Sequence, residues 1–170
     1  MLYKTKALPA KETLVLLGKK NTNWSGYGFS DKEFTFLNKC IKNKEMKTVH
    51  INQYERNVYV QLIEEKDNND LVNEACRRAG NNLLVRLNDN KDSTVTIVDA
   101  ASNPGAVLSY AEGMALGNYR FTKYINDKKK TAAALKKIKI YCHPAGGHPQ
   151  GGNKISSEDL DLLNTVIDAN

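Results

Sequence analysis

The sequence predicts an α/β protein with a mostly parallel sheet, an antiparallel portion, and helices packed on both faces. Short runs rich in valine, isoleucine and leucine alternate along the chain with segments whose apolar residues recur at helical spacing. Two strand-like runs, 48–52 and 58–63, lie about five residues apart, which indicates a hairpin. The chain has 170 residues, enough for one domain with its own hydrophobic core.

The chain opens with a predicted strand, a loop and a capped helix. The continuous apolar run Leu14–Leu17, closed by Gly18, is typical of a buried strand. The stretch 21–28 is rich in turn-forming residues and predicts a loop. Ser30 and Glu33 have the spacing of a capping box, so we expect an amphipathic helix over 31–43. Its apolar positions are Phe34, Leu37, Cys40 and Ile41.

A second helix is predicted after the hairpin, over 67–79, with Gly80 as its C-cap. The positions expected on its apolar face are Leu71, Val72, Ala75, Cys76 and Ala79. The next run, Leu83–Leu87, fits a strand and an extension of this helix equally well. A strand follows over 94–99 and ends in Asp99.

A third helix is predicted from the N-cap Asn103 and the N1 residue Pro104 to Gly117 and Asn118. A final strand is predicted over 135–141, followed by a loop of glycine, proline and histidine. Ser156 or Ser157 caps a last helix, whose apolar positions are Leu160, Leu163, Val166 and Ile167.

The composition favours a cytoplasmic protein without disulfides. No stretch approaches the ~20 apolar residues of a membrane-spanning helix. The N-terminal Met1–Lys4 runs directly into polar residues and lacks the apolar region of a signal peptide. Three cysteines far apart indicate reduced thiols, of which we expect two to pack against helix neighbours. We also expect His50 to be half-buried in its strand.

The net charge of +6 is concentrated in one segment. Residues 119–139 contain eight basic side chains and the single acid Asp127. Such a block attracts nucleic acid or an acidic partner. The alternative is a solvated lysine-rich connector, which we favour because aromatic rings are not interleaved with the lysines of 128–139.

Gly113 and Gly117 stand four residues apart on the third predicted helix, so one helix face lacks side chains and another strand or helix can approach closely. Three aromatic residues and an arginine follow. The stretch 111–124 resembles an A-E-G-x-x-L-G-x-Y-R-F-x-x-Y signature of the cytosol (leucyl) aminopeptidase family. The matching signature residues are Glu112, Gly113, Gly117, Tyr119, Arg120, Phe121 and Tyr124.

The resemblance implies a macro-domain-like, three-layer α/β/α fold over residues 1–153, and over 154–170 the start of a helix leading to a catalytic domain. In this family the N-terminal domain helps to organise a hexamer. The chemistry belongs to the C-terminal domain, where two divalent cations, zinc or manganese, activate water. This chain lacks that domain's N-T-D-A-E-G-R motif, so we assign it no catalytic, metal-binding or cofactor-binding residues.

Two further binding hypotheses come from the loops. Cys142, His143 and His148 form a potential zinc-binding trio, although a surface loop without metal is the preferred interpretation because a fourth ligand is missing nearby. A macro-like fold also suggests binding of ADP-ribose or another phosphate ligand. Its candidate loops are 24–28 and 102–105, the second of which opens a helix.

Overall fold

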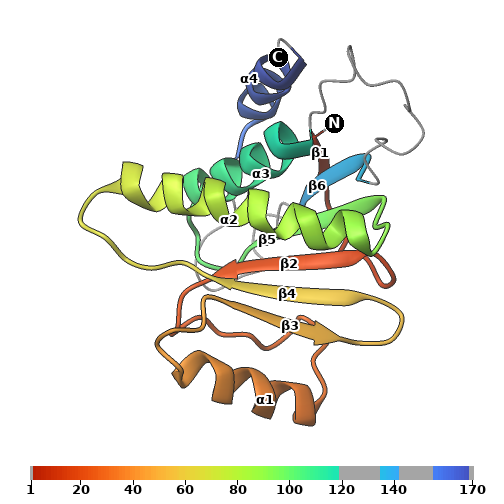
Figure 1. The fold of residues 1–170 in the computed structure, drawn as a ribbon, viewed down its shortest axis with the longest axis vertical. Coiled ribbons are helices and arrows are strands. Elements are labelled where there is room, and N and C mark those ends of the chain that lie inside the picture. The colour runs from red at the N-terminus through yellow and green to blue at the C-terminus, as the bar shows by residue number, and fades with distance from the viewer. Residues whose placement is uncertain (1, 119–134, 142–154, 169–170) are drawn as a thin grey trace.

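The structure is a computed structural model that describes residues 2–118, 135–141 and 155–168 (Figure 1). Strands and helices alternate along most of the described chain, as the sequence predicts. The elements are β1 (Leu2–Thr5), β2 (Thr13–Gly18), α1 (Asp31–Lys42), β3 (Thr48–Asn52), β4 (Asn57–Leu62), α2 (Asn69–Asp89), β5 (Thr94–Asp99), α3 (Pro104–Asn118), β6 (Lys137–Tyr141) and α4 (Ser157–Asp168).

The six strands form one mixed sheet in the order β1-β6-β5-β2-β4-β3. All neighbouring pairs are parallel except β3 and β4, which form the predicted antiparallel hairpin. The central strand β2 pairs with β4 on one side and with β5 on the other. The mostly parallel sheet and its antiparallel portion therefore confirm the predicted fold class.

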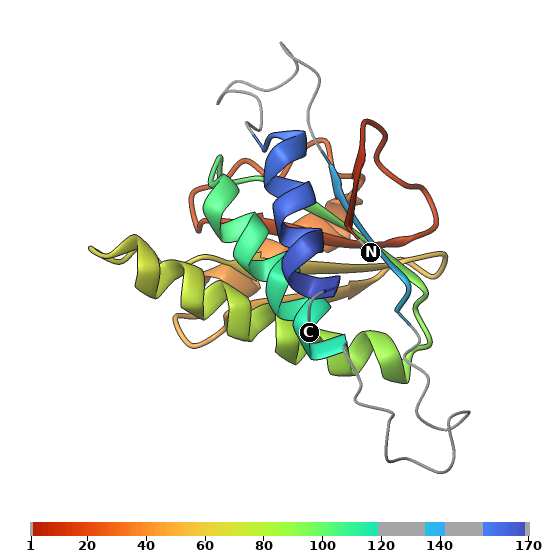
Figure 2. The same cartoon turned by 90° about the horizontal axis from the view of Figure 1, so that it is seen from above.

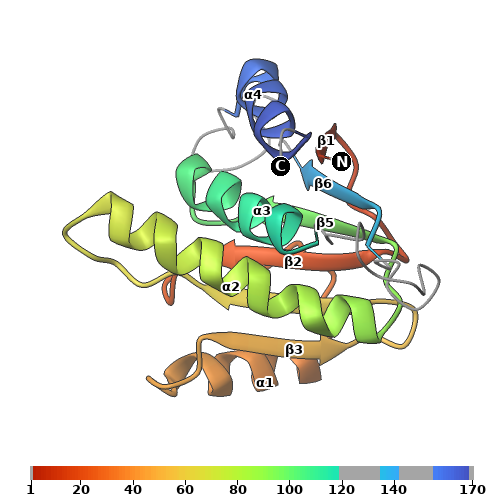
Figure 3. The same ribbon diagram turned by 45° about the horizontal axis from the view of Figure 1, so that its top comes forward.

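The helices cover both faces of the sheet, which gives three layers (Figures 2 and 3). On one face, α2, α3 and α4 pack over a core that includes Val15 and Leu17 of β2. On the other face, α1 packs over a second core that includes Leu14 and Leu16. Burial of both faces explains why β2 is a continuous apolar run without polar alternation.

The first helix agrees closely with the expectation from sequence. Ser30 accepts a hydrogen bond from the backbone N–H of Glu33, and the Glu33 carboxylate accepts one from the Ser30 N–H, which completes the capping box. Leu37, Cys40 and Ile41 are buried against the sheet. Phe34 is 36% exposed, so the apolar face is narrower than predicted.

The second helix is longer than predicted, and the assignment of Gly80 as its C-cap is wrong. α2 continues from Asn69 to Asp89, so the ambiguous run Leu83–Leu87 is a helix extension. Gly80 lies in the middle of the helix, where a Cβ atom would collide with the backbone carbonyl of Tyr110. A glycine is needed there because α2 and α3 come into close contact at this position. In the sequence alone, the same glycine resembles a helix C-cap.

The edge strand β1 was not predicted from the sequence. It contains four residues, of which only Leu2 is buried, so its apolar pattern is too short to recognise. Its position depends on distant partners. β1 pairs with β6, and the Asn164 side chain of α4 bonds both the N–H and the C=O of Leu2, at 3.0 and 3.1 Å.

The remaining helix boundaries follow their predicted caps. Asn103 accepts a hydrogen bond from the Ala106 N–H at 3.1 Å and caps α3. Ser156, one of the two predicted candidates, accepts from the Asp159 N–H and caps α4. Of the predicted apolar positions in α4, Leu160 and Ile167 are buried and Val166 is 42% exposed.

Two smaller expectations have different outcomes. Cys40 of α1 and Cys76 of α2 are buried free thiols, as expected. His50 is exposed rather than half-buried, because it lies on the edge strand β3. Its ring stacks on that of Tyr59, the residue opposite in β4, with ring centroids 4.5 Å apart.

Candidate functional site

The third helix is the most buried helix of the structure, because it lies between α2, α4 and the sheet. Its apolar residues are distributed around the whole helix, which is typical of a helix enclosed by other elements. The buried side chains include Val107, Tyr110, Ala111 and Met114. The signature segment 111–124 therefore begins on α3, the helix that contacts both α2 and α4.

Glycines on both helices bring α2 and α3 into backbone contact. A Cβ atom on Gly113 would collide with the carbonyl oxygen of Arg77, and one on Gly80 would collide with the carbonyl oxygen of Tyr110. A Cβ atom on Gly117 would instead meet the flexible side-chain amide of Asn81. The approach is closest where backbone faces backbone, and a larger residue at Gly113 or Gly80 would push the helices apart.

An ion-pair network lies beside these glycines. The Arg77 guanidinium bonds Glu112 of α3 at 2.8 Å and Glu74 of its own helix at 2.7 Å. Hydrogen bonds to Glu112 and Glu74 raise the pKa of Arg77 further above its ordinary value. Glu112 is the only charged residue among the described signature residues, and its ion pair with Arg77 links α3 to α2. Arg77 was not predicted as a functional residue, because nothing in the local sequence pattern distinguishes it from Arg78.

A buried carboxylate lies at the end of β5, where the loop to α3 begins. One Asp99 oxygen accepts hydrogen bonds from the backbone N–H groups of Ala101 and Asn103, at 3.1 and 3.0 Å. Burial raises the pKa of Asp99, although backbone hydrogen bonds from Asn103, Ala101 and Ser102 oppose this effect. Among the described residues, the other carboxylate oxygen has no hydrogen-bond partner.

The two loops proposed for phosphate binding both follow neighbouring parallel strands, β2 and β5, at this carboxyl end of the sheet. Tyr27, from the first loop, is close enough to Asp99 and Tyr141 for their charges to affect it. Burial is the largest cause that raises the pKa of Tyr27 to about 12, followed by Asp99 and then Tyr141. This is the edge where open α/β sheets commonly bind ligands. However, the Asp99 carboxylate already accepts hydrogen bonds from the backbone N–H groups of Ala101 and Asn103, at the start of the second loop. These N–H groups are therefore not free to bind a phosphate.

Several sequence-predicted residues lie outside the described residues. Among the signature positions these are Tyr119, Arg120, Phe121 and Tyr124, and the proposed zinc trio Cys142, His143 and His148 is outside as well. Most of the basic segment 119–139 is also outside, so the nucleic-acid hypothesis stays a prediction. Within 2–118, 135–141 and 155–168, no three histidine, cysteine, aspartate or glutamate side chains are grouped to hold a metal ion.

The described helices are too short or too polar to resemble membrane-spanning segments. α2 is the longest at 21 residues, but it carries several charged side chains, among them Glu74, Arg77, Arg78 and Arg86. Over the part of the chain that the structure describes, none of the helices has the length and apolar character needed to cross a bilayer.

Comparison with known proteins finds a similar fold in two larger enzymes and no match at the level of sequence. No protein-family model matches the chain, and no curated protein gives a significant sequence match. The structure is similar to a tomato leucine aminopeptidase mutant, with a TM-score of 0.65, 10% identity, and coverage of 98% of this chain and 36% of that one. It is also similar to the bottromycin maturation enzyme BotP in complex with Mn, with a TM-score of 0.52, 11% identity, and coverage of 94% and 30%.

At these identities the likeness concerns the fold. The three-layer arrangement of this chain recurs in both of the larger proteins. This chain spans 36% and 30% of their lengths, so most of each of those proteins has no counterpart among these residues.

Proposed function

We propose that this chain is the non-catalytic N-terminal domain of a leucyl aminopeptidase-like metallopeptidase. In the complete enzyme it contacts its own catalytic domain, organises a homo-oligomer (a hexamer by resemblance) and shapes access to the active site. The complete enzyme removes N-terminal amino acids from peptides in the cytoplasm. Two divalent cations, zinc or manganese, supply the activated water in the catalytic domain.

The coverage of the structural comparison carries this proposal. The fold relationship spans 98% of this chain but 36% of the leucine aminopeptidase mutant, as expected for one domain of a larger enzyme. The signature at 111–124 supports the same relationship from the sequence, and the sequence lacks the N-T-D-A-E-G-R motif of the catalytic half. The second similar structure is an enzyme in complex with Mn, which supports a metal-dependent complete enzyme here.

The contacts of the signature residues support a scaffolding role for this domain. Glu112 bonds Arg77, and Gly113 lies against the Arg77 carbonyl, so both residues hold two helices together. These contacts join α2 and α3 into one closely packed layer on one face of the sheet. A closely packed layer of this kind is suited to holding a catalytic domain and neighbouring subunits in place.

The coding sequence beyond residue 170 tests the proposal most directly. We expect it to encode a second domain with the N-T-D-A-E-G-R motif. The complete protein should hydrolyse leucine-4-nitroanilide with manganese or zinc and should elute as a hexamer in light-scattering chromatography. The 170-residue chain alone should be inactive with either metal. Hydrolysis by this chain alone, or a reading frame that stops near Asn170, would contradict the proposal.

A further inference from the structure

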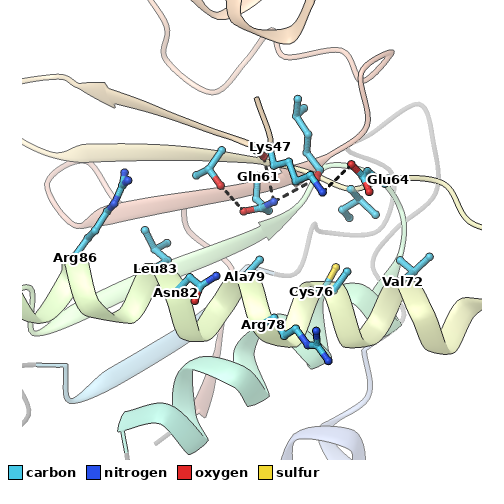
Figure 4. Close-up of a pocket in the computed structure, with 14 residues that line it drawn as sticks. Lys47, Gln61, Glu64, Val72, Cys76, Arg78, Ala79, Asn82, Leu83 and Arg86 are labelled. Carbon is cyan, nitrogen blue, oxygen red and sulfur yellow. Dashed lines mark hydrogen bonds and ion pairs between the residues drawn. The ribbon is translucent and has the colours of Figure 1, made fainter. Parts of the chain in front are cut away.

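A groove runs along α2 at the end of the sheet formed by β3 and β4 (Figure 4). It consists of two adjoining hollows of about 380 and 470 Å³. The hollows share Lys47, Leu62, Ile63 and Glu64, so they form one continuous surface. In the first hollow, one wall is the side of α2 from Val72 to Arg86, and the opposite wall is the chain around Lys47 and Glu64. The second hollow lies beyond Lys47 and Glu64, and the loops that line it carry Lys20, Lys44 and Lys66.

The floor of the groove is apolar. Ile63, Val72, Cys76 and Leu83 line it, and each is between 4 and 7% exposed. Burial raises the pKa of the Cys76 thiol to about 11, so this side chain is neutral at pH 7. The buried Gln61 amide donates to the Lys47 carbonyl and accepts from Thr48, so its polar atoms are satisfied within the protein. The floor therefore favours apolar groups of a partner.

The rim of the groove is strongly basic. Three of its cations have carboxylate partners, because Lys19 pairs with Glu65, Lys47 with Glu64, and Arg78 with Glu74. The other four are exposed and make no ion pair within the described residues: Lys20, Lys44, Lys66 and Arg86. Basic and acidic side chains nearly balance over the described residues as a whole, so this groove concentrates an excess of positive charge.

We propose that this groove binds an acidic peptide segment of a partner protein. Leucine-like side chains of the segment would lie on the apolar floor, and its carboxylates would pair with the four unpartnered cations. This complementarity favours a peptide over a nucleic acid. Among the described residues that line the groove there is no aromatic ring on which a base could stack.

Fluorescence anisotropy with two labelled octapeptides tests the inference on the 170-residue chain. The first contains alternating pairs of leucine and glutamate, and in the second serine replaces leucine. We expect saturable binding of the first peptide and at least about tenfold weaker binding of the second, because serine cannot use the apolar floor. No saturable binding of the leucine peptide, or equal binding of both peptides, would overturn the proposal.

Variants assign the binding to the groove. The double substitution Lys44→Glu with Lys66→Glu should weaken the leucine peptide about tenfold, because it reverses two unpaired charges on loops. The matched control, Lys32→Glu with Lys39→Glu, lies on α1 across the sheet and should change affinity less than about twofold. Equal losses in both double variants would show that the attraction comes from overall charge and would overturn the proposal.

A second pair of variants tests the apolar part without changing the charge. Ala75 is exposed on α2 and lines the groove, so Ala75→Trp should block it and abolish saturable binding. Val85 is 61% exposed on the same helix and does not line the groove, so Val85→Trp should bind normally. Circular dichroism confirms folding of each variant. Unchanged binding of the leucine peptide by Ala75→Trp would contradict the proposal. It would also be contradicted if an eight-nucleotide DNA bound more tightly than the leucine peptide and the double substitution Lys44→Glu with Lys66→Glu abolished that DNA binding.

Discussion

Gly113 of α3 lies directly against the backbone carbonyl of Arg77 in α2. The contact has a counterpart in the opposite direction, since Gly80 of α2 lies against the carbonyl of Tyr110 in α3. Each helix therefore supplies a glycine where the backbone of the other passes. This reciprocal arrangement explains why two residues of low helix propensity lie inside long helices.

The first prediction concerns this helix contact. Gly113→Ala should lower the free energy of unfolding by about 2–3 kcal/mol, because the added methyl group meets backbone that cannot rotate away. Urea denaturation followed by circular dichroism measures the change. The matched control is Gly105→Ala in the same helix, where the nearest atom to a new Cβ is 3.4 Å away. It should be neutral or stabilising by up to about 1 kcal/mol. Equal losses in the two variants would contradict the packing argument.

The second prediction concerns the pair Arg77 and Glu112. Their side chains are 37% and 23% exposed, so solvent screens much of their attraction. A double-mutant cycle with Arg77→Met and Glu112→Gln should give a coupling energy of about 0.5–1 kcal/mol. The coupling should shrink in 1 M sodium chloride. A coupling of zero at low salt would show that this ion pair does not contribute to holding α2 and α3 together.

The third prediction concerns the buried hydroxyl of Tyr110. The side chain is fully buried, and within the described residues its hydroxyl has no hydrogen-bond partner. Tyr110→Phe should therefore raise the free energy of unfolding by about 1 kcal/mol, because an unpaired polar group is removed from the core. Tyr59→Phe serves as the comparison, since its hydroxyl accepts from Asn90 at 3.4 Å, and it should cost about 0.5 kcal/mol. Destabilisation by Tyr110→Phe would disprove the prediction.

The fourth prediction concerns pH and Asp99. Burial raises the pKa of this carboxyl above its ordinary value of 3.8. Because the folded protein then holds the proton more tightly than the unfolded chain, the contribution of Asp99 to stability is greatest below pH 3.8. This contribution is lost as the pH rises through the folded pKa.

Asp99→Asn tests this sign, since an amide oxygen still accepts the N–H groups of Ala101 and Asn103. The variant should match the wild type below pH 3.8 and gain relative stability as the pH rises to 7. Urea titrations at several pH values measure the difference between the two proteins. A relative gain toward acid pH would reverse the conclusion.

Local patterns were sufficient where each element carries its own boundary signals. The capping box of Ser30 and Glu33 predicted α1, and Asn103 with Pro104 predicted the start of α3. These signals involve residues within one helical turn, so they need no information about the rest of the chain. The same reasoning failed at Gly80, because the contact that requires glycine there comes from Tyr110, which lies 30 residues further along.

The candidate site was predictable only in part. The spacing of Gly113 and Gly117 predicts that another element comes close to this face of the helix, but the sequence does not identify that element as α2. The partner of Glu112 is Arg77, which lies 35 residues away. The groove along α2 has no sequence signature, because its basic rim comes from separate loops and one helix.

The sequence by itself determined the alternation of strands and helices, the hairpin, most of the caps and a mostly parallel sheet. These features depend on hydrophobic period and on hydrogen bonds between near neighbours. Only the tertiary structure decided the length of α2, the existence of β1 and the partners of the glycines. Each of these depends on contact between residues far apart in the chain, such as Leu2 with Asn164, and such contacts form only when the chain folds.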